Sequence, residues 1–215
     1  MAGGQTRVVV RQIITGDLSI DTQQAMPRIF VIGGPNGAGK TTAAAGLLPE
    51  ILECEEYVNA DAIANALSPF ASERAAFKAG RLMLDAIHEL AASRRSFAFE
   101  TTMASRSFVP FLRRCRASGY EVRLVFLWLK SVRLARSRVA KRVRSGGHDI
   151  PMDVIKRRYR VGTHNFLHLY VPLADQWAAY DNSGRKPTLV ARSTAPGKME
   201  LLQPEVWHKL LNVAE

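Results

Sequence analysis

A glycine-rich motif near the start of the chain constrains its fold more than any other feature. Residues Gly34–Thr41 read GPNGAGKT and match the pattern G-x-x-x-x-G-K-[ST] in full. The apolar run Ile29–Gly33 precedes the motif, and the Ala- and Leu-rich segment Lys40–Leu48 follows it. This context predicts a strand, a tight loop and a helix, which together form a phosphate-binding loop (P-loop).

The P-loop motif also predicts ligands. Its glycines let successive backbone N–H groups surround a phosphate, and Lys40 can reach the β- and γ-phosphates of a nucleotide. The Thr41 hydroxyl can ligate Mg²⁺, so we expect ATP and Mg²⁺ as ligands, with Thr41 as the metal-binding residue. The motif residues predicted to contact the nucleotide are Gly34, Asn36, Gly37, Ala38, Gly39, Lys40, Thr41 and Thr42.

Apolar periodicity predicts alternating strands and helices over most of the chain. The expected strands are Ile29–Gly33, Tyr57–Asn59, Phe97–Phe99, Val122–Leu129, Ala179–Asp181 and Thr188–Arg192. The expected helices are Lys40–Leu48, Ala62–Leu67, Ser72–Ser93, Ser131–Ser145, a helix from Pro151 towards Tyr170, and a turn or two over Pro172–Trp177. This alternation predicts an α/β fold in which helices cover both faces of a parallel sheet, a three-layer arrangement.

Composition indicates one globular domain. The 215 residues are 47% hydrophobic and 23% charged, as in ordinary globular proteins. We expect a single domain over residues 26–215, with the polar residues 1–25 as an extension outside its core. No apolar run approaches the roughly 20 residues that span a bilayer, and no secretory leader is evident. The two cysteines are too far apart for a CxxC site. We therefore expect a cytoplasmic protein without a membrane partner.

Basic residues are concentrated in one part of the chain. The net charge is +11, yet the stretch Arg106–Arg160 contains sixteen basic and three acidic residues, so it accounts for the whole excess. Such a stretch suggests a polyanionic ligand, either nucleotide phosphates or a nucleic-acid backbone. A solvated helix face that carries arginines is the alternative interpretation.

Two acidic residues follow expected strands. Asp61 comes after Tyr57–Asn59, and Glu100 ends the strand that begins at Phe97, followed by Thr101 and Thr102. In an open parallel sheet both acids should lie at the carboxyl edge, which the P-loop also occupies. There, one carboxylate could take a proton from an acceptor hydroxyl while the other orients the acceptor. The alternatives are that Asp61 caps a helix and that Glu100 pairs with an arginine.

Four arginines beyond the expected central sheet could close over the phosphates. Arg138 and Arg142 lie four residues apart on one helix face, and Arg157 and Arg158 follow the break at Ser145–His148. A helical segment over about residues 138–160 could therefore act as a lid that neutralises phosphate charge during transfer.

Taken together, these segments resemble the zeta-toxin family of P-loop kinases, in particular a bacterial branch often labelled predicted ABC-type ATPase. The resemblance spans about residues 28–184. It is carried by Gly33–Thr42, Val58–Ala64, Ser96–Thr102, Arg138–Val143, Gly146–Pro151, Arg157–Tyr159 and Tyr180–Ser183.

The resemblance implies an adenylate-kinase-like fold with parallel strand order 2-3-1-4-5, and ATP·Mg²⁺ as the phosphoryl donor. It implies that Asp61 is the base on the acceptor hydroxyl and that Glu100 and Thr102 bind the acceptor. In zeta toxins the acceptor is the 3′-hydroxyl of the amino sugar of UDP-N-acetylglucosamine. A separate antitoxin protein is the partner that the family suggests.

The resemblance further implies that Arg142, with Arg157 or Arg158, clamps the phosphates. We assign Arg142 and Arg158 to catalysis, together with Lys40 and Asp61, and Arg138 and Arg157 to nucleotide binding.

Two other functions stay open from the sequence. The basic stretch would suit a polynucleotide or RNA kinase, although its aromatic residues have no regular spacing for stacking bases, which makes nucleic acid the less favoured ligand. A nucleotide-dependent switch ATPase, without a small-molecule acceptor, would also use the P-loop.

Overall fold

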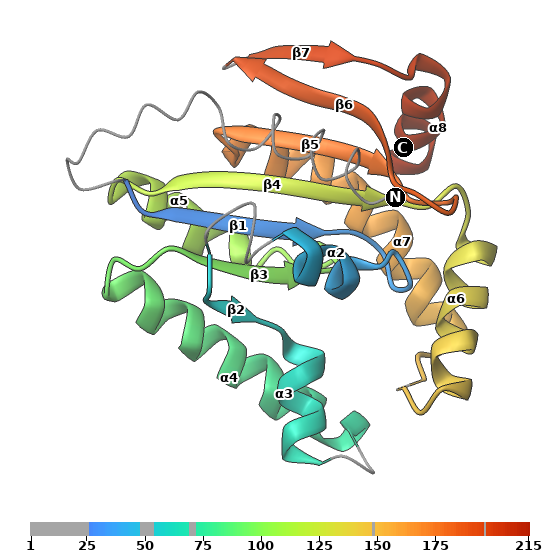
Figure 1. Ribbon diagram of the computed structural model, residues 1–215, viewed down its shortest axis with the longest axis horizontal. Coiled ribbons are helices and arrows are strands. Elements are labelled where there is room, and N and C mark those ends of the chain that lie inside the picture. Colours follow the sequence, from blue (N-terminus) through green and yellow to red (C-terminus); the bar gives the residue numbers. More distant parts are fainter. Residues whose placement is uncertain (1–25, 48–53, 69–71, 148, 196) are drawn as a thin grey trace, which may run out of the picture.

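A single sheet organises the chain, for which the computed structural model describes residues 26–47, 54–68, 72–147, 149–195 and 197–215. Its strands lie in the order β2-β3-β1-β4-β5-β6-β7 (Figure 1). Neighbours from β2 to β5 pair in parallel, whereas β6 and β7 are added antiparallel at one edge. The three-layer α/β class and the strand order 2-3-1-4-5 are therefore confirmed, with two further strands.

Helices connect these strands. The strands are β1 (Arg28–Gly33), β2 (Tyr57–Val58), β3 (Phe97–Thr101), β4 (Glu121–Trp128), β5 (Gln176–Asp181), β6 (Thr188–Ala195) and β7 (Lys198–Leu201). The α-helices are α2 (Lys40–Leu47), α3 (Ala60–Leu67), α4 (Ser72–Ala92), α5 (Phe108–Ala117), α6 (Val132–Arg144), α7 (Met152–Asn165) and α8 (Pro204–Ala214). Helix α7 continues into the π-helical turn Phe166–Tyr170 and the 3-10 turn Val171–Leu173.

Both faces of the central strands are buried, because side chains alternate along each strand. On β1, Ile29 and Val31 enter the core that is covered by α4, α5, the π-helical turn and α8. Phe30 and Ile32 enter the opposite core, which α2, α6 and α7 cover. Ring stacking of Phe126 on Phe166, with centroids 4.0 Å apart, ties β4 to the first of these layers. The sheet is thus a rigid platform whose carboxyl edge is open.

The glycine-rich loop and the basic helices lie at the carboxyl edge of the sheet. The parallel strands all end on the same side of the sheet, shown at the right of Figure 1, where the loop before α2 lies close to α3, α6 and α7. The turn between α6 and α7 uses Gly146 at φ +84, and the chain reverses there to bring the two helices together.

The structure corrects one expected element and adds three. Pro172–Trp177 was expected to be helical, but only the 3-10 turn forms and Trp177 belongs to β5. The reason is Asp175, whose Oδ2 accepts the Val122 N–H at 2.8 Å and so aligns the chain with β4. Helix α5, strand β7 and helix α8 were not predicted; α5 has arginines beside its apolar residues, and β7 has only four residues.

The predicted extension over residues 1–25 lies outside the described residues, and the division of the chain at residue 26 stays a prediction. Among the helices of the described part, none is both long and apolar enough to cross a membrane.

Candidate active site

The P-loop connects β1 to α2 through residues 34–39. Gly34 has φ +145, and a Cβ there would lie 2.3 Å from the carbonyl oxygen of Leu127. Gly37 has φ +77, and its Cβ would lie 2.8 Å from the carbonyl oxygen of Ala135. Glycine is therefore required at both positions by conformation and by space. The loop is held against β4 and α6 and leads into the N-terminus of α2, where first-turn amides favour an anion.

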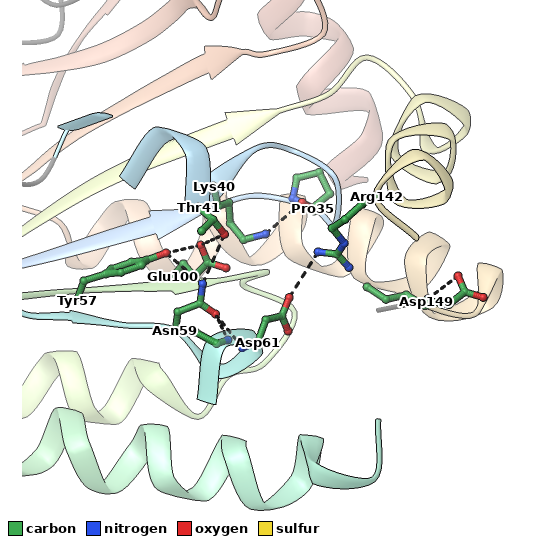
Figure 2. Close-up of polar contacts among 11 residues, drawn as sticks. Pro35, Lys40, Thr41, Tyr57, Asn59, Asp61, Glu100, Arg142 and Asp149 are labelled. Atoms are coloured by element: carbon green, nitrogen blue, oxygen red, sulfur yellow. Dashed lines mark hydrogen bonds and ion pairs between the residues drawn. The ribbon is translucent and has the colours of Figure 1, made fainter. Parts of the chain in front are cut away.

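Lys40 begins α2 and is 9% exposed. Its Nζ donates a hydrogen bond to the carbonyl oxygen of Pro35 at 3.3 Å, so the side chain curls back over the loop (Figure 2). Burial lowers the pKa of Lys40, and the nearby carboxylates of Glu100 and Asp61 partly oppose that shift. A phosphate bound in the loop would supply the negative charge that this buried ammonium group favours.

Glu100, at the end of β3, faces the first turn of α2. Its Oε2 accepts hydrogen bonds from the Thr41 hydroxyl at 3.0 Å and from the Tyr57 hydroxyl at 2.6 Å (Figure 2). In the described part of the chain its hydrogen bonds thus come from hydroxyls, and no ion pair with an arginine accompanies them. Tyr57 is a site residue that the sequence interpretation missed, because β2 was recognised only as a short strand.

Asp61 lies in the first turn of α3 and points towards α6. The helix cap is Asn59, whose Oδ1 accepts the N–H groups of Asp61 at 2.8 Å and Ala62 at 3.1 Å. The alternative role of Asp61 as the cap is therefore wrong. Its carboxylate is 60% exposed and Oδ2 lies 3.6 Å from Nη1 of Arg142 (Figure 2). The cap leaves this carboxylate available for chemistry.

Thr102 follows β3 in a loop that α7 holds in place. Met103 has φ +58, a conformation that a non-glycine residue rarely adopts, and its N–H donates to Oγ1 of Thr101 at 3.0 Å. Nδ2 of Asn165 donates to the carbonyl oxygen of Met103 at 2.7 Å. A Cβ at Gly162 would lie 2.3 Å from the carbonyl oxygen of Thr102. The loop is therefore fixed by direct contact with α7.

Gly162→Ala is expected to destabilise the protein by about 1–3 kcal/mol, because the added methyl group would meet a backbone oxygen. Gly80→Ala is the matched control: Gly80 is also helical, nothing lies within 4 Å of its Cβ position, and alanine should be neutral or stabilise α4 by up to about 1 kcal/mol. Urea unfolding of the two variants measures the difference. Equal stabilities would show that α7 and the loop separate easily.

Two of the four predicted lid arginines lie beside Asp61. Arg142 and Arg158 line, with Asp61, a small cavity of about 210 Å³. Arg158 is half-buried, and this burial lowers its pKa while the Asp61 carboxylate opposes the shift.

The other two predicted lid arginines do not lie beside Asp61. The Nη2 atom of Arg138 donates to the carbonyl oxygens of Ser183 at 3.2 Å and Gly184 at 3.3 Å. Arg157 is exposed and lines none of these cavities.

The main cavity of this site, of about 410 Å³, lies between the P-loop, α3, α4 and the loop after β3, whereas a larger cavity of about 720 Å³ lies away from the P-loop, between α7 and the end of α8. Its polar lining includes Asn36, Lys40, Asn59, Asp61, Arg81, Glu100, Thr101, Thr102, Ser105, Ser107 and Arg158. Its apolar lining includes Ala76, Phe77, Met83, Leu84 and Phe108. Oδ1 of the buried Asn36 has no hydrogen-bond partner among the described residues. Thr42, by contrast, is exposed on α2 and does not line the cavity.

Comparison with known proteins places this site in a family. The model of the family described as Zeta toxin matches residues 13–185. An uncharacterized protein of Haemophilus influenzae is 28% identical over 126 residues, which are 59% of this chain and 88% of that protein.

Solved structures share the fold at low sequence identity. A chain of the AvrRxo1-ORF1:-ORF2 complex with ATP superposes with a TM-score of 0.71 at 15% identity, over 96% of this chain and 69% of that one. In the sulphate-bound form of that complex this chain covers only 63% of its counterpart. A structure of the PezAT chromosomal toxin–antitoxin system of Streptococcus pneumoniae has a TM-score of 0.61 at 16% identity, over 98% and 95% of the two chains. The chain belongs to the Zeta toxin family.

Proposed function

We propose that this protein transfers the γ-phosphoryl group of ATP to a hydroxyl group of a small molecule bound in the main cavity. The observation that carries the proposal is that Lys40, Asp61, Glu100 and Arg158 all line this one cavity at the carboxyl edge of the sheet. A phosphate-binding lysine, an exposed carboxylate and a cation are groups that phosphoryl transfer to an alcohol uses.

The proposed reaction needs one proton acceptor and a place for the developing charge. The Asp61 carboxylate accepts the proton of the acceptor hydroxyl as its oxygen attacks the γ-phosphorus. The bond from the γ-phosphorus to the β–γ bridging oxygen breaks, and ADP leaves with that electron pair. Lys40 stabilises the negative charge on the β- and γ-phosphates, and Arg142 and Arg158 do so from the lid. Glu100 and Thr102 are the proposed acceptor-binding residues.

The remaining arginines are proposed to contact the nucleotide. The Cβ of Arg138 would be 3.1 Å from a Cβ at Gly37, so this residue borders the P-loop directly. Arg157 lies outside the cavity, and its proposed contact therefore requires the lid to close further over the phosphates.

The site also suits Mg²⁺. Oγ1 of Thr41 and Oε2 of Glu100 are hard oxygen ligands 3.0 Å apart beside the P-loop. No group of three or more His, Cys, Asp or Glu residues that could hold a metal exists within the described part of the chain. Mg²⁺ does not need one, since it binds through one or two protein oxygens, water and substrate phosphates. Thr41, with Glu100 nearby, would hold the ion, which neutralises phosphate charge when bound.

A nucleotide sugar such as UDP-N-acetylglucosamine is the proposed acceptor. Family membership supports it, and so does a cavity that combines apolar groups such as Phe77 with Arg81 and several hydroxyls. ATP and such a sugar would place the reaction in the cytoplasm. A separate antitoxin is the proposed partner, because the similar PezAT structure belongs to a toxin–antitoxin system.

The test is transfer of label. The protein is incubated with γ-labelled ATP and either UDP-N-acetylglucosamine or a metabolite extract, and the labelled product is identified. We expect a phosphorylated small molecule and none with the Lys40→Ala variant. ATP binding without any labelled product from the extract would contradict the kinase proposal and favour a nucleotide-dependent switch.

A polynucleotide kinase is the second candidate, because the two helices that form the proposed lid are strongly basic: α6 carries six Lys and Arg residues and α7 carries four. The same assay with a 5′-hydroxyl oligonucleotide decides between them. A strand-binding enzyme should lose affinity by orders of magnitude between about 50 and 200 mM salt. Transfer to a nucleotide sugar, which offers far fewer phosphates to the protein than a nucleic-acid strand, should depend much less on salt over that range.

A further inference from the structure

Four side chains beside the P-loop form a closed ring of hydrogen bonds. Thr41 and Tyr57 both donate to Oε2 of Glu100, at 3.0 and 2.6 Å. Nδ2 of Asn59 closes the ring, since it lies 3.3 Å from the Tyr57 hydroxyl and 3.5 Å from Oγ1 of Thr41. Figure 2 shows the four residues facing one another from α2, β2, the start of α3 and β3. The ring joins three separate parts of the chain: the start of α2, the segment from β2 to the cap of α3, and the end of β3.

Tyr57 is suited to act as a permanent donor in this ring. Its hydroxyl donates to Oε2 of Glu100 at 2.6 Å, and a phenol is an O–H donor at neutral pH. A charge-assisted O–H···O bond of this length is among the stronger hydrogen bonds in proteins. Because Oε2 receives two donors, the Glu100 carboxyl group is held in one orientation. Its Oε1 receives no hydrogen bond from the described residues and is left for other ligands.

We propose that Tyr57 is a positioning residue for the magnesium-binding pair of Thr41 and Glu100, and that Asn59 links this pair to Asp61. The inference rests on the proposed ATP·Mg²⁺ reaction. Tyr57 holds the carboxylate towards Thr41, so that both oxygens are oriented before the ion arrives. Asn59 uses its amide nitrogen for the ring and its Oδ1 for the N–H of Asp61, at 2.8 Å. The metal-binding oxygens and the proposed base therefore share one support.

The test is the Mg²⁺ dependence of nucleotide binding, measured with a fluorescent ADP analogue. In Tyr57→Phe the Mg²⁺ concentration for half-maximal binding should rise roughly tenfold, because loss of a residue that orients a metal ligand commonly costs 10–100-fold in metal affinity. Affinity for the analogue in EDTA should stay within about twofold of the unmodified protein, since the hydrogen bonds of Tyr57 among the described residues go to side chains and not to the P-loop backbone.

Tyr120→Phe is the matched control. The Tyr120 hydroxyl also hydrogen-bonds inside the fold, to the carbonyl oxygens of Leu90, Ala91 and Arg95, but away from the P-loop. This variant should titrate with Mg²⁺ like the unmodified protein, and thermal unfolding shows whether both variants are folded.

A double substitution tests whether Tyr57 acts through Glu100. Glu100→Gln should itself raise the Mg²⁺ requirement, and adding Tyr57→Phe should then change it less than about twofold. An independent variant, Asn59→Ser, keeps a residue that caps α3 well but removes the amide donor, and it should raise the requirement by about two- to threefold. It keeps the inference testable if Tyr57→Phe does not fold.

Three results would overturn the inference in different ways. An unchanged Mg²⁺ requirement in both Tyr57→Phe and Asn59→Ser would show that the ring does not orient the metal site. Equal losses of affinity with and without Mg²⁺ would make Tyr57 a general structural residue. If the unmodified protein bound no nucleotide at all, the proposed function would fall first, and the inference with it.

Discussion

Lys40→Ala is expected to reduce phosphoryl transfer by about 10³-fold. Lys40 is the buried cation of the P-loop, 9% exposed and hydrogen-bonded to the carbonyl oxygen of Pro35, so its loss removes the ammonium group from the loop. A single preorganised donor to developing charge contributes 10²–10³ in rate, and a charged one in a buried site contributes at least as much. ATP affinity should fall as well. The measurements are initial rates with γ-labelled ATP and equilibrium binding of ATP.

Lys209→Ala is the control for this variant. Lys209 is an exposed lysine of α8, so its loss removes the same charge from the protein without touching the P-loop or the lid. Its rate should stay within about twofold of the unmodified protein. Retained transfer in Lys40→Ala would show that the loop does not act on the nucleotide phosphates.

Asp61→Ala is expected to reduce transfer by about 10²- to 10⁴-fold, the usual contribution of a positioned general base, while ATP binding is spared. Asp61 is the one proposed proton acceptor, and its helix is capped by Asn59 rather than by Asp61 itself. Its ion pair with Arg142 is exposed, so stability should change by less than about 1 kcal/mol. Single-turnover rates and ATP titrations separate chemistry from binding.

The exposed Asp85 of α4 provides the control, since Asp85→Ala removes an equal charge at a distance from the P-loop. A loss of ATP affinity in Asp61→Ala as large as that in Lys40→Ala would count against the base assignment. It would make Asp61 a metal-binding or structural residue.

The fold was predictable where short-range chemistry determines it. Gly34 and Gly37 require conformations that few other residues adopt, and the buried runs of β1 and β4 read as central parallel strands. The prediction of helix from Pro172 to Trp177 was wrong because a long-range hydrogen bond from the Val122 N–H to the Asp175 carboxylate, rather than local helix propensity, decides the conformation of this segment. The residues around Asp175 do not by themselves indicate that its carboxylate will bind the Val122 N–H, which lies 53 positions away.

The candidate site was likewise predictable where a local motif marks its residues, and not where long-range contacts do. The motif and the strand ends identified Lys40, Asp61 and Glu100, which the structure brings to one cavity. Tyr57 and Asn59 escaped notice because their importance lies in contacts with Glu100 and Thr41, residues up to 43 positions away. An Asn two residues before an acid at a helix start was the available signal, since Asn is a preferred cap.

The contact between α7 and the loop after β3 has a consequence for selectivity. Arg158, Gly162 and Asn165 recur every three or four residues and therefore share one stripe of α7. Gly162 packs directly against the Thr102 carbonyl group, and the Asn165 side chain donates a hydrogen bond to the Met103 carbonyl oxygen. The Arg158 guanidinium group and the loop after β3, which lines the cavity, are therefore mechanically coupled through α7. In the proposed reaction, a ligand that displaces the loop after β3 would therefore displace Arg158 as well, so α7 would couple the fit of the acceptor to the position of this cation.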